Sequence, residues 1–177
     1  METLNGENIF LRALEPEDLE FLFDVENDEK LWKVSNTSVP FSKYLLRRYL
    51  DNSHKDIYEF RQLRLIISTY DGTRLGIIDI FDFEPAHRRA AIGILISSEK
   101  HRSKGYGSEA LALVCEYCFK RLGLHQVYAN VGAENTSSRV LFEKAGFLQT
   151  VRKVDWNFIE GEYHDEIMYQ LINTDVH

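Results

Sequence analysis

The chain has 177 residues, of which 44% are hydrophobic and 28% are charged, and it carries a formal net charge of −7. A chain of this length typically forms one domain with a sizeable buried core, so we treat residues 1–177 as a single domain. The acidic balance argues against a nucleic-acid partner held by phosphate contacts. The sequence shows no signal peptide and no apolar run long enough for a membrane span, so we expect a cytoplasmic protein with no membrane partner.

Hydrophobic patterns and turn residues predict the elements of the first half of the chain. Pro16 favours the first turn of a helix, and Ser42 starts a second one. Asp71-Gly72 predicts a tight turn between two strands. The expected elements are a strand at 8–13, a helix from 16, an irregular stretch at 28–41, a helix from 42, and strands at 63–69 and 75–83.

The second half begins with a strand whose apolar centre does not alternate, which indicates burial on both faces. Gly123 is a natural end for the long helix that follows, and Asn135 can cap a further helix that ends at Gly146. The expected elements are a strand at 89–97, a helix at 107–122, a strand at 127–131, a helix at 135–146, and two strands up to about 172. This order predicts an α/β (α+β) fold, with a mixed sheet and helices on both of its faces.

The loop at 102–108, Arg-Ser-Lys-Gly-Tyr-Gly-Ser, lies between the buried strand and the long helix. A tight glycine loop at a helix N-terminus presents backbone N–H groups and the positive end of the helix dipole to one point, which suits a phosphate. The spacing is too short for a Walker loop and lacks the glycine pattern of a dinucleotide fold. What the loop does match is Arg-x-x-Gly-x-Gly.

Several segments, in the expected order, resemble the GNAT N-acetyltransferase superfamily. The loop at 102–108 with its flanking strand and helix resembles the acetyl-CoA motif, and Asn135 followed by EKAGF at 143–147 resembles the second motif. The ending at 160–169 resembles the ribosomal-protein N-terminal branch, and the segment at 84–90 resembles both that branch and the polyamine (spermidine) branch. The resemblance implies the GNAT fold, a mixed and mostly antiparallel central sheet of about seven strands.

The resemblance also implies an enzyme that moves the acetyl group of acetyl-CoA to a primary amine, by direct transfer in a ternary complex. The glycine loop would bind the pyrophosphate, and the backbone of Leu95 and Ile96 would pair with the pantetheine arm. A bulge at Gly93 or at Ser97-Ser98 would splay this strand from its neighbour. Asn135 would hydrogen-bond the cofactor arm, or only cap its helix. The implied cofactor-binding residues are Leu95, Ile96, Arg102, Ser103, Lys104, Gly105, Tyr106, Gly107, Ser108 and Asn135.

Catalysis requires that the amine lose a proton and that the departing thiolate gain one. Asp79 and Asp82 lie on opposite faces of their strand by parity, so at most one should face a shared pocket. Glu84 matches the family's Glu-Pro position, and we favour it as base or amine-positioning group, the alternative being a solvated carboxylate in a turn. Polyamine enzymes carry a tyrosine acid where this chain has Phe142. The N-terminal branch implies Ser138 instead, with a helix-surface serine or protonation by water as the alternatives.

The acceptor stays open between a peptide or protein α-amine and a polyamine or small amine. Phe142 and the ending at 160–169 favour the first, whereas the acidic balance and the segment at 87–90 favour the second. The acidic cluster at 24–29 is either a cation-binding patch or a solvated helix face. A non-catalytic acyl-CoA-binding regulatory module is the alternative function. Histidine spacing predicts no metal site, the C-x-x-C at 115–118 is interpreted as buried small side chains, and a homo-oligomer is left open.

Overall fold

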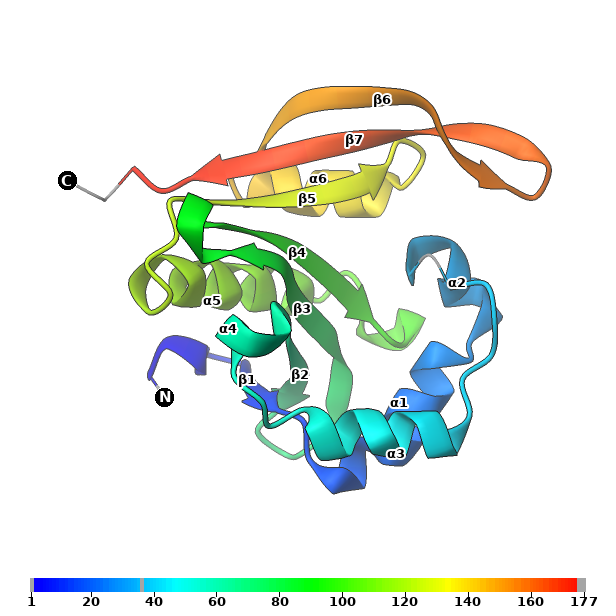
Figure 1. Cartoon of the computed structure of the whole chain (residues 1–177), viewed down its shortest axis with the longest axis vertical. Coiled ribbons are helices and arrows are strands. Elements are labelled where there is room, and N and C mark those ends of the chain that lie inside the picture. Colours follow the sequence, from blue (N-terminus) through cyan, green and yellow to red (C-terminus); the bar gives the residue numbers. More distant parts are fainter. Residues whose placement is uncertain (1, 36, 175–177) are drawn as a thin grey trace.

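Seven strands form one sheet in the order β1-β2-β3-β4-β5-β7-β6, within a computed structural model that describes residues 2–35 and 37–174 (Figure 1). Neighbouring strands are antiparallel except for β4 and β5, which are parallel. The predicted mixed and mostly antiparallel sheet is therefore confirmed. The strands are β1 (Ile9–Ala13), β2 (Leu63–Thr69), β3 (Arg74–Glu84), β4 (Arg89–Ile96), β5 (Gln126–Gly132), β6 (Leu148–Ile159) and β7 (Glu162–Ile172).

Helices cover both faces of the sheet because the inner strands are apolar at successive positions. On β2, Leu65 and Ile67 point into one core, which α5 and α6 complete. Ile66 of β2 and Ile77 of β3 point into a second core, which α1, α2 and α3 complete. None of the helices in the described residues is both long and apolar enough to cross a membrane. The helices are α1 (Leu19–Glu26), α2 (Glu29–Ser35), α3 (Lys43–Asn52), α4 (Ile57–Phe60), α5 (Tyr106–Lys120) and α6 (Thr136–Lys144).

The predicted helix ends are confirmed by their local geometry. The Ser42 hydroxyl accepts a hydrogen bond from the Leu45 N–H at 3.1 Å, which caps α3. Gly123 and Gly146 follow α5 and α6 with positive φ values of 63° and 90°, a backbone conformation that glycine adopts without strain.

The stretch at 28–41, expected to be irregular, contains the helix α2, so that prediction was wrong. Long-range hydrogen bonds hold the segment in place. The Trp32 indole N–H donates to the Glu26 carbonyl at 2.9 Å, and the Asn27 side chain both donates to and accepts from the backbone of Phe41, at 3.0 and 2.8 Å. These contacts are tertiary, and a seven-residue helix is too short to show a clear hydrophobic period.

A buried carboxylate fixes the first helix to the sheet. Asp18, fully buried, accepts two hydrogen bonds from Arg12 of β1 at 2.8 Å each, one from Arg74 of β3 at 2.6 Å and one from the Glu15 N–H at 2.8 Å. Burial alone would raise the pKa of Asp18, but the Arg12, Glu15 and Arg74 donors outweigh it and lower the pKa to about 2. Asp18 therefore ties β1, β3 and the start of α1 together.

The two cysteines lie on the inner face of α5. Both are free and buried, and burial raises the pKa of the Cys115 thiol to about 12 and that of Cys118 well above its usual value. The interpretation of the C-x-x-C as buried side chains is confirmed, because thiols with such pKa values stay protonated at neutral pH.

Candidate active site

The parallel strands β4 and β5 pair only at one end. In the part of the chain that the structure describes, their ladder runs from Arg89 opposite Gln126 to Ala91 opposite Tyr128. Beyond this point the strands diverge, because β5 continues along β7 while β4 stays paired with β3 (Figure 1). The backbone of β4 from Ile92 to Ile96 thus has no strand partner on its β5 side, and such an edge can pair with an extended ligand.

The bulge lies on a different strand from the one expected. The β3–β4 register is continuous from Gly76 opposite Ile96 to Phe81 opposite Ala91, so Gly93 is not bulged. The register shifts instead between Phe81 and Glu84 of β3. The prediction of a bulge at Gly93 or Ser97-Ser98 was therefore wrong: β4 is regular, and the divergence follows from the course of β5.

A groove of about 420 Å³ runs between the open edge of β4 and the N-termini of α5 and α6. We call it the β4–α6 groove. It brings together residues of β4, of the loop and helix start at 101–108 and of α6, together with Leu31 of α2, and it includes every predicted cofactor-binding residue except Lys104 and Tyr106. Those that line it are Leu95, Ile96, Arg102, Ser103, Gly105, Gly107, Ser108 and Asn135.

Glycine suits positions 105 and 107 of the loop for different structural reasons. Gly105, the N-cap of α5, has a φ of 85°, which strains any other residue. Gly107 has no such requirement, and a Cβ added there would meet Leu141 at 3.7 Å and Ile94 at 3.9 Å, which are ordinary contacts. Because Gly107 lines the groove, its missing side chain leaves room for a ligand. The first-turn N–H groups of α5 have no intrahelical acceptor and suit a phosphate.

Asn135 and Ser138 lie side by side at the start of α6. The Asn135 side-chain oxygen accepts a hydrogen bond from the Ser138 N–H at 3.2 Å, so the expected cap is present. Both residues also line the β4–α6 groove. Phe142, one turn further along α6, is buried between Phe147 and Tyr169, with ring centroids at 5.0 and 6.4 Å. It offers no proton to a leaving thiolate.

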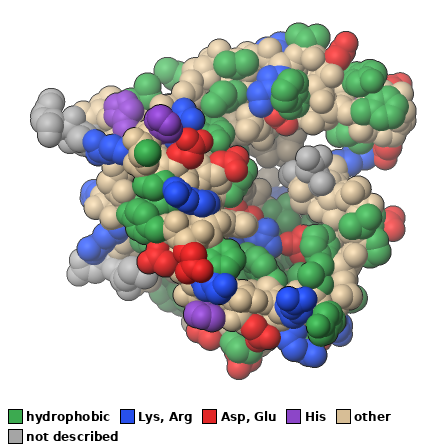
Figure 2. Space-filling view, in the orientation of Figure 1, with side chains coloured by type: hydrophobic (Ala, Val, Ile, Leu, Met, Phe, Trp, Pro, Cys, Tyr) green, Lys and Arg blue, Asp and Glu red, His purple; other side chains and the backbone are tan. Residues whose placement is uncertain are grey.

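A second cleft, of about 520 Å³, reaches the same part of β4 from the side of α1. We call it the β3–β4 cleft. It shares Ile94 and Leu95 with the β4–α6 groove, and Asn130 of β5 lines it across the divergence. Its polar lining includes Glu26, Arg64, Asp79 and Asp82. Figure 2 shows the surface hollowed between the β6–β7 hairpin and the N-terminal helices, where a third cleft reaches Ser138.

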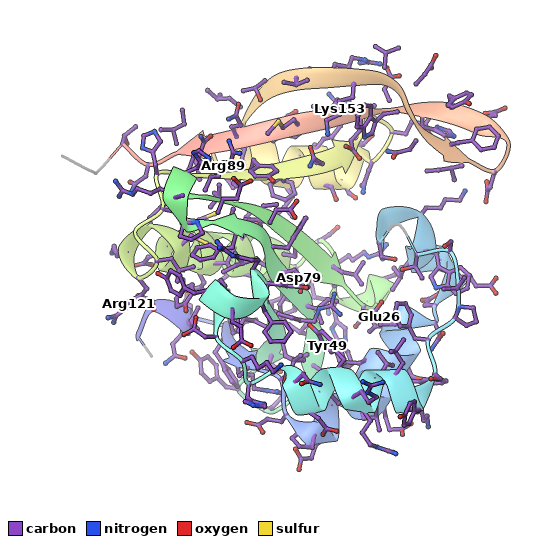
Figure 3. All side chains as sticks on the ribbon, in the orientation of Figure 1. Glu26, Tyr49, Asp79, Arg89, Arg121 and Lys153 are labelled. Carbon is purple, nitrogen blue, oxygen red and sulfur yellow. The ribbon has the colours of Figure 1, made fainter. Side chains whose placement is uncertain are left out.

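The charged lining of the β3–β4 cleft consists of three carboxylates, Glu26, Asp79 and Asp82, and two guanidinium groups, Arg61 and Arg64. Arg64 donates two hydrogen bonds to Asp79 at 2.7 and 2.8 Å and one to Glu26 at 2.5 Å, and it lies over the Tyr49 ring at 5.7 Å. Figure 3 labels these three partners of Arg64, which come from β3, α1 and α3. Burial alone would lower the pKa of Arg64, but the charges of Asp79 and Glu26 raise it. Because three carboxylates face two guanidinium groups, the lining keeps a small net negative charge, which favours a cationic ligand.

The acidic cluster expected at 24–29 is divided by the fold. Glu26 points into the β3–β4 cleft, whereas Asp24 and Glu29 are exposed. The cluster is thus part cleft wall and part solvated helix face.

Glu84 and Ser138, the predicted catalytic pair, are not brought together. Arg89, labelled in Figure 3, lies at the paired end of β4 and β5. It donates to both carboxylate oxygens of Glu84, at 3.2 and 3.1 Å. Glu84 is not among the residues that line the described clefts, whereas Ser138 is. The role of Glu84 stays a prediction, and its surroundings resemble the alternative of a carboxylate in a turn.

The alternation of side chains along β3 predicted that at most one of Asp79 and Asp82 faces a shared pocket. This prediction was wrong, because both line the β3–β4 cleft. Asp82 sits in the bulge with a φ of 46°, and a bulge breaks the two-residue period of a strand. That Glu26 and Arg64 belong to one site was also not predicted. Glu26 lies on the helix α1 and Arg64 on the inner strand β2, and no sequence pattern indicates that these two elements meet.

The profile of the acetyltransferase (GNAT) domain family matches residues 8–148. The chain belongs to this family. It is therefore an N-acetyltransferase that takes its acetyl group from acetyl-CoA, and not a non-catalytic acyl-CoA-binding module. The glycine loop and the open edge of β4 fit this donor, because they offer backbone groups and the space that a Cβ at Gly107 would fill.

Curated relatives cover most of the chain. The spermidine N(1)-acetyltransferase of Vibrio cholerae is 28% identical over 155 residues, which are 88% of this chain and 87% of that protein. The putative ribosomal N-acetyltransferase YdaF of Bacillus subtilis is 28% identical over 173 residues, 96% and 94% of the two chains. A crystal structure of the Vibrio cholerae spermidine N-acetyltransferase with CoA and spermine matches with a TM-score of 0.85 at 24% identity, over 94% and 96% of the two chains.

Proposed function

We propose that this enzyme acetylates a primary amine of a polyamine or another small amine with several positive charges. The observation that carries the proposal is the β3–β4 cleft, whose lining keeps a small net negative charge because three carboxylates face two guanidinium groups. Its volume of about 520 Å³ lies in the range of small-molecule sites. The similarity to spermidine acetyltransferases supports the same acceptor class.

We further propose direct transfer within a ternary complex. The β4–α6 groove and the β3–β4 cleft approach Ile94 and Leu95 from two sides, so donor and acceptor can be bound together. In this arrangement the 102–108 loop binds the pyrophosphate, the backbone of Leu95 and Ile96 pairs with the pantetheine arm, and Asn135 contacts that arm. Proximity and orientation then supply much of the rate enhancement.

Ser138 is the group that we propose near the departing thiolate. It lies where the β4–α6 groove meets the third cleft, and Phe142 beside it has no exchangeable proton. A thiol has a pKa near 8.5, so the thiolate is a tolerable leaving group and water can complete its protonation. Ser138 therefore assists the step and is not essential to it.

The test is acetyl-CoA-dependent release of free thiol with spermidine, spermine, and peptides that begin with Ser or Ala. Turnover with the polyamines and not with the peptides is the expected result. Turnover with peptides alone would contradict it and would favour a protein N-terminal α-amine, the acceptor that the ending at 160–169 and the match to YdaF favour. Cytoplasmic location and a homo-oligomeric state stay predictions.

A further inference from the structure

Three carboxylates lie between the middle and the end of β3, and their partners differ. Asp79 is held by two hydrogen bonds from Arg64, and Glu84 by two from Arg89. Asp82 has no ion pair among the described residues, and its side chain accepts only a long hydrogen bond, 3.5 Å, from the Tyr128 hydroxyl. Of the three, Asp82 is therefore the carboxylate that can bind a cation without first breaking an ion pair.

The backbone at Asp82 has an uncommon conformation, and the one side-chain hydrogen bond of Asp82 among the described residues is the long one from Tyr128. A φ of 46° lies in the left-handed region, which non-glycine residues seldom adopt, although Asp and Asn do so more readily than most. The bulge at this position turns the Asp82 side chain into the β3–β4 cleft, onto the same wall as Asp79. Strain of this kind persists mostly at functional sites, where the position of one side chain matters more than local stability.

Asp82 also lies at a defined place relative to Ile94 and Leu95, where the two proposed binding sites meet. Tyr128, its hydrogen-bond partner, stands opposite Ala91, at the last pair of the β4–β5 ladder before the strands diverge. From there the cleft continues along Gly93 and Ile94 to Leu95, which the β4–α6 groove shares. Burial, and to a smaller extent the negative charge of Asp82, raises the pKa of Tyr128. The phenol therefore stays protonated, and its O–H can donate a hydrogen bond to the Asp82 carboxylate.

We propose that Asp82 binds an ammonium group of the acceptor other than the amine that is acetylated. A carboxylate stabilises the charged form of a neighbouring amine, whereas the attacking nitrogen must be neutral. Asp82 thus suits the nitrogen that stays protonated, while the reacting amine lies nearer Ile94 and Leu95. This inference rests on the proposed function and makes Asp82 a specificity-determining residue for acceptors with at least two cationic nitrogens.

The first test compares the KM for spermidine of wild type, Asp82→Asn and Asp51→Asn. Asparagine is tolerated at positive φ, so Asp82→Asn keeps the bulge and removes only the charge. Asp51 is an exposed aspartate of α3 that lines none of the described clefts, and its variant controls for the change in net charge. We expect the KM for spermidine to rise about tenfold or more in Asp82→Asn, with the KM for acetyl-CoA unchanged.

A second variant separates binding from structure. Asp82→Gly relieves the positive φ, so its Tm should equal or exceed that of wild type, while the KM for spermidine still rises as in Asp82→Asn. A merely structural role would lower Tm and leave the spermidine KM unchanged. In both variants, kcat/KM for the monoamine 1-aminobutane should fall less than kcat/KM for spermidine.

The possible results separate a failure of this inference from a failure of the proposed function. If wild type acetylates spermidine and Asp82→Asn has the same KM as Asp51→Asn, the inference is overturned and the proposed function stands. An equal loss with spermidine and 1-aminobutane would also overturn it, because Asp82 would then act on the reacting amine. If wild type acetylates peptides and not spermidine, the proposed function fails, and the inference fails with it.

Discussion

Under the proposed function, the two sides of β4 recognise their ligands by different means. On the β4–α6 side the ligand contacts come from backbone groups, from a helix N-terminus and from the missing side chain of Gly107. On the β3–β4 side they come from charged side chains on three separate elements. A donor common to a whole family can be bound by backbone geometry, whereas an acceptor that varies among relatives calls for side chains that can be exchanged.

The largest effect on stability should come from removing the Arg64 guanidinium group from the β3–β4 cleft. Arg64→Met leaves Asp79 and Glu26 unpaired in a largely buried position, and we expect unfolding to become easier by about 3–5 kcal/mol. Urea denaturation measures the change, and Arg47→Met, at an exposed arginine of α3, is the matched control. Equal stability of the two variants would mean that the acceptor side does not depend on this ion-pair network.

The Asp18 contacts, on the same side of the sheet, should make the free energy of unfolding depend on pH in the acid range. Because the pKa of Asp18 is lowered to about 2, its stabilising effect is complete above the unfolded pKa near 3.9 and is lost as pH falls toward 2. Asp18→Asn should cost about 2–3 kcal/mol at pH 7, and the gap to wild type should close between pH 4 and pH 2. A gap that stays constant over this range would exclude ionised Asp18 as its source.

On the opposite side, Gly107→Val should block the donor while the fold remains. The added side chain enters the β4–α6 groove, and we expect the Kd for acetyl-CoA to rise by at least about 30-fold, which is about 2 kcal/mol. Isothermal titration calorimetry measures it. Ala112→Val, at an exposed position of the same helix, controls for the helix propensity of valine. Unchanged affinity in Gly107→Val would place the donor elsewhere.

The smallest effects should distinguish the two predicted catalytic residues. Ser138→Ala should lower kcat about tenfold with little change in the KM for acetyl-CoA, because general-acid assistance is only part of the barrier. Glu84→Gln should stay within about threefold of wild type, since Glu84 is paired with Arg89 and lines none of the described clefts. The reverse order of effects would restore Glu84 as the catalytic carboxylate.

The donor side could be predicted from the sequence because its signals are local. Gly105 marks a positive φ, Asn135 marks a helix cap, and both lie in short motifs whose geometry the neighbouring residues determine. The acceptor side could not be predicted in this way. Asp82 reaches its cleft through a bulge that inverts the parity of β3, and Glu26 meets Arg64 across 38 positions of sequence.

The short ladder between β4 and β5 divides the sheet into two lobes, one ending with β4 and the other beginning with β5. Backbone pairing joins them only over Arg89–Ala91, and α5 packs beneath the seam. A donor that pairs with the free edge of β4 and touches α6 bridges this seam as a missing strand would. In the binding mode that we propose, acetyl-CoA becomes a temporary part of the architecture, and amide hydrogen exchange along both diverging strands should slow when it binds.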